Sequence, residues 1–317
     1  MEISIGYWIG FIVFVVIMLM LDLGVFHKKN TEVKIKEAVI WSIFWISLAL
    51  IFNVGVYYLF GKQQAFDFFT AYVLEKSLSV DNLFVFIMIF GYFNIVPKYQ
   101  HKVLFWGIFG ALIMRAVFTF AGVALIHKFS WIMYVFGIFL IYSGISMIAG
   151  KKEGGFDPNK NMIMRWFRKM IPVTEDSSDP SFFTRKNGVL YATPVFLALL
   201  FIEISDVVFA VDSIPAVLSV SNDIFIVFTS NIFAILGLRS LYFALNGLMS
   251  YFHYLKYALA GILSFIGLKM SINEFTKMSD YDFHITNYAS LGIIVSLLTI
   301  SIIFSVLKKK QNKITSQ

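Results

Sequence analysis

Long apolar runs alternate with short polar segments along almost the whole 317-residue chain. A run of about 17–25 predominantly apolar residues is long enough to cross the hydrocarbon core of a bilayer as an α-helix. This criterion predicts about nine membrane spans, which lie near residues 7–26, 38–60, 66–91, 103–126, 130–149, 190–219, 223–247, 254–272 and 288–307. We therefore expect an all-α polytopic membrane protein, with residues 1–317 forming a single transmembrane domain.

The composition supports this fold class and excludes several functions. Hydrophobic residues make up 59% of the chain and charged residues 14%, and the mean hydropathy is +0.78. Soluble domains have about 45–50% apolar and about 25% charged residues. The chain contains no cysteine, so disulfides, thiolate metal sites and cysteine nucleophiles are excluded. Its net charge of +7 comes from basic residues between the apolar spans, so we expect no nucleic-acid partner.

Basic residues gather in alternate connections between the predicted spans. The connections after the first, third, fifth and seventh spans, and the end of the chain, carry most of the loop lysines and arginines. By the positive-inside rule, the N-terminus is predicted to lie outside and the C-terminus in the cytoplasm, which agrees with an odd number of spans. The first run has no basic segment before it and no small-residue cleavage site after it. We therefore expect a retained helix rather than a signal peptide.

Two of the predicted spans carry carboxylates that lipid would reject. Glu75 and Asp81 lie in the third span, and Glu203, Asp206 and Asp212 lie in the sixth. A charged side chain at bilayer depth costs at least a few kcal/mol, so it is rare and usually functional. These two segments are therefore the most informative part of the chain.

The two acidic segments resemble each other. In each of them two acids stand six residues apart, and a small polar residue follows the second acid, Asn82 in one segment and Ser213 in the other. The next span carries a matching arginine in both cases, Arg115 and Arg239. The match in polar residues indicates an internal repeat, because chance similarity between apolar helices would not supply it.

We predict that residues 66–150 and 190–272 form two repeats of three spans each. An odd number of spans places the copies in opposite orientations. Such inverted repeats are typical of secondary transporters, which bind their substrate at the repeat interface. Small residues within the spans are expected at close helix crossings; they are Gly107, Gly110, Gly137, Gly144, Gly237 and Gly261.

Residues 151–189 form the one long connection, a predicted cytoplasmic linker between the repeats. Apolar residues at 162–170 line one side of a helix, and basic residues face elsewhere. This pattern fits a short amphipathic helix on the anionic leaflet and equally a helix packed on the bundle. The acidic and serine-rich stretch that follows is expected to be a solvated loop.

Broken helices are expected at both acidic segments. Residues six apart on an ideal helix differ by about 120° in direction, so two acids of one segment converge on a single site only if the helix is interrupted. Pro215 removes the hydrogen-bond partner of the Val211 carbonyl in the second copy. Ser77 and Ser79 can compete for backbone groups in the first copy.

The candidate metal ligands all offer hard oxygen atoms, and they are Glu75, Asp81, Asn82, Glu203, Asp206, Asp212 and Ser213. Neither acidic segment contains a histidine, and sites made only of oxygen suit magnesium, calcium and manganese. The predicted charge-balancing residues are Lys76, Arg115 and Arg239. With five acids the sum at full ionisation is −2, which one divalent cation would neutralise. Without a metal we expect some carboxylates to take up protons, so exchange of metal for protons is our hypothesis.

Several of these residues have a purely structural alternative. Glu75 and Lys76 could form an ion pair, and the aspartates of the second copy could anchor the two arginines. Glu203 lies closest to the cytoplasmic side of its span and could face water in a vestibule. Asp22, near the cytoplasmic end of the first span, is expected to be an interfacial or packing residue rather than a primary ligand, with an accessory role in metal binding as the alternative.

The motifs resemble those of the TerC family of integral membrane proteins, and most of all its Alx-type branch. Glu-Lys-Ser-Leu-Ser-Val-Asp-Asn-Leu-Phe-Val-Phe at 75–86, Phe-Ala-Val-Asp-Ser-Ile-Pro-Ala at 209–216 and the segment 230–243 carry the resemblance. It implies manganese export across the bacterial inner membrane, in a family with members named for tellurium resistance. It also implies that the five acids form the metal path, although an acidic cavity would repel the tellurite oxyanion.

The leading hypothesis is therefore a manganese exporter that uses proton entry, with no enzymatic activity and no resident cofactor. One alternative is transport of calcium, or a broader flux of cations or protons. A non-transporting scaffold for the stress response is another, although buried acids would bring a scaffold no benefit to offset their insertion cost. An intramembrane aspartyl protease is disfavoured because Gly-x-Gly-Asp is absent, and no glycine loop for nucleotides is present.

Overall fold

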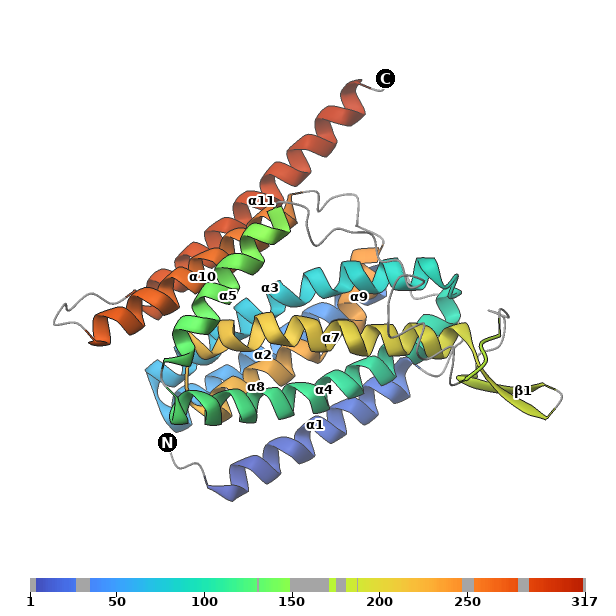
Figure 1. Cartoon of the computed structure of the whole chain (residues 1–317), viewed down its shortest axis with the longest axis horizontal. Helices are drawn as coiled ribbons and strands as arrows, with labels where there is room; N and C mark the ends of the chain where they lie inside the picture. Colours follow the sequence, from blue (N-terminus) through green and yellow to red (C-terminus); the bar gives the residue numbers. More distant parts are fainter. Residues whose placement is uncertain are drawn as a thin grey trace.

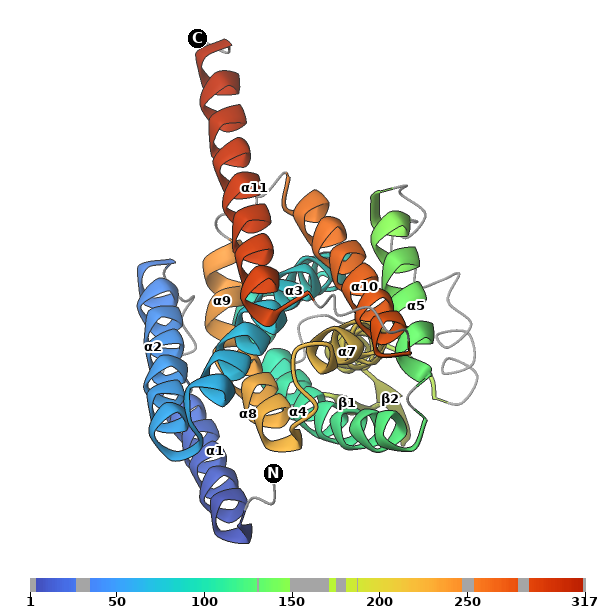
Figure 2. The same cartoon turned by 90° about the vertical axis from the view of Figure 1, so that its left-hand side faces the viewer.

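A computed structural model describes residues 4–26, 35–129, 131–148, 171–174, 181–186, 188–246, 254–278 and 285–315 (Figures 1 and 2). Helices make up nearly all of this part of the chain, which confirms an all-α polytopic membrane protein. They are α1 (Ile5–Phe26), α2 (Ile35–Phe60), α3 (Lys62–Tyr92), α4 (Pro97–Lys128), α5 (Ile132–Ile148), α7 (Pro194–Leu218), α8 (Ile224–Ile235), α9 (Leu238–Asn246), α10 (Leu255–Met278) and α11 (Asn287–Thr315).

The described helices coincide in position with the nine predicted apolar runs. Six of them are long and apolar enough to cross a membrane, and the bent pair α8–α9 makes a seventh. α5 is apolar but only 17 residues long, and α3 has 31 residues but carries several charged side chains. The total of nine crossings, their orientation and the inverted repeat stay predictions.

Four helices occupy the centre of the bundle. α4 packs against α7, α3 packs against α8, and α3 also contacts α7. Figure 2 shows α1 and α2 on one side of this centre and α5 and α10 on the other. In the predicted repeats α3 corresponds to α7, and α4 corresponds to α8. The α4–α7 contact therefore corresponds to the α3–α8 contact, and both contacts are present. The two acidic helices, α3 and α7, therefore lie together in the interior.

Polar residues define where the helices of the second half begin. Thr193 caps α7, and its hydroxyl accepts a hydrogen bond from the backbone N–H of Phe196 at 3.3 Å. Asp223 caps α8, and its carboxylate accepts from the N–H groups of Phe225 and Ile226 at 3.0 and 3.2 Å. These caps satisfy N–H groups that have no partner within the helix.

Glycines bring α5 and α10 into backbone contact, as expected for small residues in membrane helices. A Cβ atom added to Gly267 would lie 2.5 Å from the carbonyl oxygen of Gly137, and one added to Gly144 would lie 2.6 Å from that of Ala260. Gly107, Gly110 and Gly237 also lie at close approaches. Gly261 is the exception among the six predicted glycines, because its added Cβ would meet only Leu297, at an ordinary 3.5 Å.

The expected helix breaks at the acidic segments are not found, so that prediction was wrong. α3 and α7 run without interruption through their acids. Ser77 donates to the carbonyl of Val73 within its own helix, which leaves the helix intact. Pro215 lies in the last turn of α7, which ends at Leu218, so its missing N–H costs the helix a single hydrogen bond.

The break occurs one span later, between α8 and α9. The two helices are bent by 41°, and Gly237 at the break has a φ of 80°. A side chain at this position would be strained by that φ and would also collide with Trp45 of α2. The sequence suggested a close contact at Gly237, but not that the glycine ends a helix.

The linker differs in part from expectation. The proposed amphipathic helix lies within 149–170, outside the described residues. Before α7 the chain forms an antiparallel hairpin of β1 (Phe183–Lys186) and β2 (Val189–Ala192), with Phe183 opposite Ala192. This hairpin extends beyond one end of the bundle in Figure 1, whereas the sequence predicted no strand in the linker and began the sixth span at residue 190.

Valine at position 267 is expected to destabilise the protein by about 1–3 kcal/mol, because overpacking forces two backbones apart. The measurement is the melting temperature of the purified protein in detergent, which should fall in Gly267→Val. Gly292→Val in α11 is the matched control, since an added Cβ there meets nothing within 4 Å. Equal shifts in the two variants would contradict the close crossing of α5 and α10.

Candidate functional site

A buried guanidinium connects the four central helices. Arg115 of α4 is 3% exposed and forms an ion pair with the fully buried Glu75 of α3. It also donates a hydrogen bond to the side-chain oxygen of Asn231 on α8 at 3.4 Å. Asp206 of α7 lies close enough for its charge to interact with that of Arg115. Arg115 therefore pairs with an acid of the first predicted repeat and lies near an acid of the second.

Glu203 belongs to the same acidic group. It lies one helical turn before Asp206 on α7, so the two carboxylates project from the same side of the helix, and their charges interact. The Glu203 carboxylate lies directly against Gly110 of α4, where any Cβ atom would collide with it. Gly110 therefore makes room for this acid. The Glu203 side chain is only partly buried.

Lys76 does not pair with Glu75, so the ion-pair alternative for these two neighbours was wrong. Its ammonium donates a hydrogen bond to the carbonyl of Ala234 at 3.0 Å. Ala234 lies in the last turn of α8, where carbonyl groups have no N–H partner within the helix. A positive charge is favourable at this helix end, so Lys76 stabilises the break before Gly237.

Arg239 is not part of the acidic site, which corrects its expected role as a counter-charge there. It pairs with Asp22 of α1 at 2.8 Å and also donates to the backbone carbonyl of Asp22 at 2.6 Å. Both side chains are buried. The structure thus gives Asp22 the packing role that the sequence favoured, and the pair neutralises itself away from the other acids.

A separate small cavity lies on the other side of the two acidic helices. Asn82 of α3 and Asp212 and Ser213 of α7 line it, together with side chains of α5 and α10. The hydroxyl of Ser143 on α5 donates a hydrogen bond to Asp212 at 2.8 Å. Asp81 lies in α3 directly before Asn82, and its side chain falls outside the described part of the structure.

Because α7 is continuous, its acids face two sides rather than one. Glu75 and Asp206 face Arg115 of α4, whereas Asn82 and Asp212 face α5 and α10. On α7 this is the rotation of about 120° that an unbroken helix imposes between Asp206 and Asp212, which are six residues apart. Among the described side chains, no three carboxylates or imidazoles lie close enough together to hold a metal ion. The metal-ligand set stays a prediction.

Sequence reasoning missed three polar residues of these sites. Asn231 contacts Arg115, and its amide also donates to Thr119 at 3.4 Å. Ser143 orients Asp212. Each is a polar residue within an apolar run, which was the available signal, but nothing in the local sequence indicated its partner.

A second polar network closes the end of the bundle that is predicted to face outside. The Asn287 amide donates to Asp67 of α3 and to the carbonyl of Val220 after α7, both at 2.8 Å. Lys269 of α10 donates to the Asn287 oxygen at 2.7 Å. Beside it lies a polar cavity of about 210 Å³, lined by residues that include Ser221, Lys269 and Glu274.

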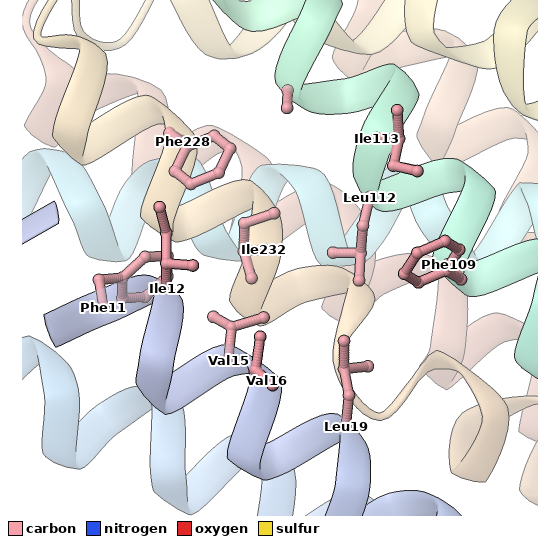
Figure 3. Close-up of a pocket in the computed structure, with 11 residues that line it drawn as sticks. Phe11, Ile12, Val15, Val16, Leu19, Phe109, Leu112, Ile113, Phe228 and Ile232 are labelled. Atoms are coloured by element: carbon pink, nitrogen blue, oxygen red, sulfur yellow. The ribbon is translucent and has the colours of Figure 1, made fainter. Parts of the chain in front are cut away.

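An apolar crevice between α1, α4 and α8 offers no ligands for a cation. Figure 3 shows its lining, which includes Phe11, Leu112 and Phe228, and every labelled side chain is hydrocarbon. Its volume is about 220 Å³. The crevice belongs to the apolar surface of the bundle rather than to the acidic sites.

Comparison with known proteins identifies the family. The family model described as "Integral membrane protein TerC family" matches residues 60–313. The chain belongs to the TerC family. The match begins after α2, so it includes both acidic helices of the TerC domain and leaves out α1 with Asp22.

Relatives of this TerC protein align over almost their whole lengths. An uncharacterized membrane protein of Myxococcus xanthus is 50% identical over 96% of this chain and 93% of its own. A putative membrane-bound redox modulator, Alx, of Salmonella typhi is 44% identical over 94% of this chain and 93% of its own. An uncharacterized membrane protein of Rickettsia felis is 41% identical over 95% of this chain and 98% of its own. No solved structure matches the chain.

Arg115→Met is expected to lower the melting temperature sharply, because removing one partner of a buried ion pair costs about 3–5 kcal/mol. Adding Glu75→Gln to this variant should restore part of the loss, since the unpaired carboxylate is then gone. Arg185→Met in the exposed part of β1 is the matched control and should change little. Purely additive losses in the double variant would contradict the Glu75–Arg115 pair.

Proposed function

We propose that this TerC-family protein exports a divalent cation, most specifically Mn²⁺, across the bacterial inner membrane in exchange for protons. One observation carries the proposal, which is the excess of buried or partly buried carboxylates over bases around α3 and α7. Four described carboxylates lie there, Glu75, Glu203, Asp206 and Asp212. Arg115 and Lys76 are the described bases beside them. The net charge at full ionisation is −2, because the Asp22–Arg239 pair is neutral and lies apart.

One divalent cation would neutralise this net charge of −2. Buried charges that lack a partner are costly, so the acids must bind either a cation or protons. Carboxylate, amide and hydroxyl oxygens are ligands for hard cations such as manganese. Manganese itself and the outward direction come from the resemblance to the TerC family. Proton entry follows because the acids that release the metal take up protons.

The two acidic sites support transport rather than static binding. They flank the contact between α3 and α7, one facing α4 and α8 and the other facing α5 and α10. A metal that passes from one site to the other crosses the interface of the two predicted repeats, which is where inverted-repeat transporters bind their substrates. The Asn287 network links α3, α10 and the segment after α7 at the end of the bundle that is predicted to face outside.

A redox role through the chain's own thiols is excluded, because the sequence has no cysteine. The name of the Salmonella typhi relative therefore does not point to thiol chemistry in this protein. Transport of calcium or of several cations remains the competing proposal, and the scaffold hypothesis predicts no flux at all. A direct measurement of metal flux distinguishes both alternatives from manganese export.

Purified protein in proteoliposomes is expected to move Mn²⁺ down its gradient, followed with a metal-sensitive dye inside the vesicles. Asp206→Asn and Asp212→Asn should each reduce this flux by about 10-fold or more, because each removes a charged ligand. Glu37→Gln, an exposed acid of α2, is the matched control and should retain full flux. Wild-type vesicles that take up calcium but not manganese would contradict the manganese assignment.

Adding Mn²⁺ to the purified protein in weakly buffered solution is expected to release protons, since the metal displaces them from the buried carboxylates. A pH indicator measures this release, which should be smaller in Asp206→Asn. Metal binding without any proton release would contradict the exchange of metal for protons. Transport of the metal without protons would then be the surviving hypothesis.

A further inference from the structure

The cavity beside Asp212 is lined by four polar or polarisable side chains and is otherwise apolar. Asn82, Asp212 and Ser213 contribute oxygen atoms, and Met147 of α5 contributes a thioether. The remaining lining consists of Leu78, Phe209, Leu259 and Leu263. Ser213 is 1% exposed, and its hydroxyl has no hydrogen-bond partner within the described structure. A buried hydroxyl without a protein partner at a cavity can bind a water molecule or another group held there.

α5 is held in a position that brings Met147 to this cavity. Ser143 and Met147 are four residues apart and therefore lie on the same face of α5, and Ser143 contacts Asp212. Between them Gly144 allows α5 to approach the backbone of α10 at Ala260, beside the cavity wall. Met147 and Asp212 thus line the same small cavity, brought together by the close crossing of α5 and α10.

The size of the cavity limits how a cation can enter it. About 20 Å³ is open to the centre of a water-sized group, and one water molecule needs about 10–15 Å³. A cation therefore fits only after it has lost most of its hydration shell. Mg²⁺ loses water reluctantly, and Ca²⁺ requires six to eight oxygen ligands, whereas this lining has three oxygen-bearing side chains and one sulfur.

We propose that Met147 is a specificity-determining ligand of this site, which admits a transition-metal dication such as Mn²⁺ and rejects Mg²⁺ and Ca²⁺. Mn²⁺ shares with Mg²⁺ and Ca²⁺ a preference for oxygen ligands. As a transition ion it nevertheless accepts one soft thioether beside its oxygen ligands more readily than Mg²⁺ or Ca²⁺, which are bound by oxygen alone. The oxygen set of Asn82, Asp212 and Ser213 alone would not make this distinction. The inference rests on the proposed transport function, but it can be tested by binding alone.

The direct test uses Cd²⁺ as a probe of sulfur ligation in the purified full-length protein. The chain has 13 methionines and no cysteine, so a sulfur neighbour of cadmium can only be a methionine thioether. X-ray absorption should show a Cd–S contribution in the wild type and in Met133→Leu, and none in Met147→Leu. Met133 is the matched control because it lies on the same helix but lines the polar cavity near Lys269.

The transport form of the test measures inhibition of Mn²⁺ flux by Ca²⁺ and Mg²⁺ in proteoliposomes. Met147→Leu keeps the volume of the side chain and removes only the sulfur, so Ca²⁺ should compete about 10-fold better than in the wild type. Met133→Leu should keep the wild-type selectivity.

Two results would overturn the proposal, and each differs from a failure of the transport function. An unchanged selectivity in Met147→Leu, in vesicles where the wild type moves Mn²⁺, would show that the methionine only fills space. Absence of a Cd–S contribution in the wild type would overturn it irrespective of transport. If the wild type moves no Mn²⁺ while Cd²⁺ binds to sulfur at Met147, the transport function fails and the metal site stands.

Discussion

The rest of the structure depends on the burial of Arg115 beside Glu75. A guanidinium and a carboxylate that are almost completely removed from solvent are stable only when each satisfies the other. Arg115 lies on α4, Glu75 on α3 and the hydrogen-bonded Asn231 on α8, and the charge of Asp206 on α7 interacts with the same guanidinium. This one side chain therefore ties both predicted repeats together, and it cannot neutralise all of the acids that surround it.

The unbroken course of α3 and α7 determines how the remaining acids are used. The continuous helix α7 presents Asp206 and Asp212 in directions about 120° apart, so the protein has an arginine-bound acidic site that includes Glu75 and a separate small cavity at Asp212. The irregular backbone lies elsewhere, at Gly237, where Lys76 satisfies a carbonyl at the end of α8. In the proposed transport, a cation that crosses between the sites would pass the α3–α7 contact, and the two predicted repeats would move against each other to let it through.

The sequence predicted the features that depend on composition and spacing. Apolar runs of sufficient length predicted the positions of the helices, and the two motifs around Glu75 and Asp212 predicted the TerC family, which the family match confirms. Small residues such as Gly137 and Gly144 are typical of close crossings, and five of the six predicted glycines lie at close approaches, Gly261 being the exception.

The partners of individual charges could not be predicted, because a partner depends on contacts between segments far apart in the chain. The repeat suggested equivalent roles for Arg115 and Arg239, yet Arg239 pairs with Asp22 of α1, which lies outside the repeat. Pro215 suggested a broken helix, but its position in the last turn makes its effect small. The contributions of Ser143 and Met147 arise only from the crossing of α5 and α10, which the local pattern of either helix does not contain.

The most direct test of the central claim, that the buried acids carry manganese out of the cell, is the manganese content of living bacteria. Cells without an exporter of their own, grown in excess manganese, would express either the wild-type chain or Asp206→Asn at equal membrane levels, with elemental analysis of washed cells as the measurement. The account predicts a clearly lower manganese content with the wild type than with Asp206→Asn or the empty vector. Equal content in all three would contradict it.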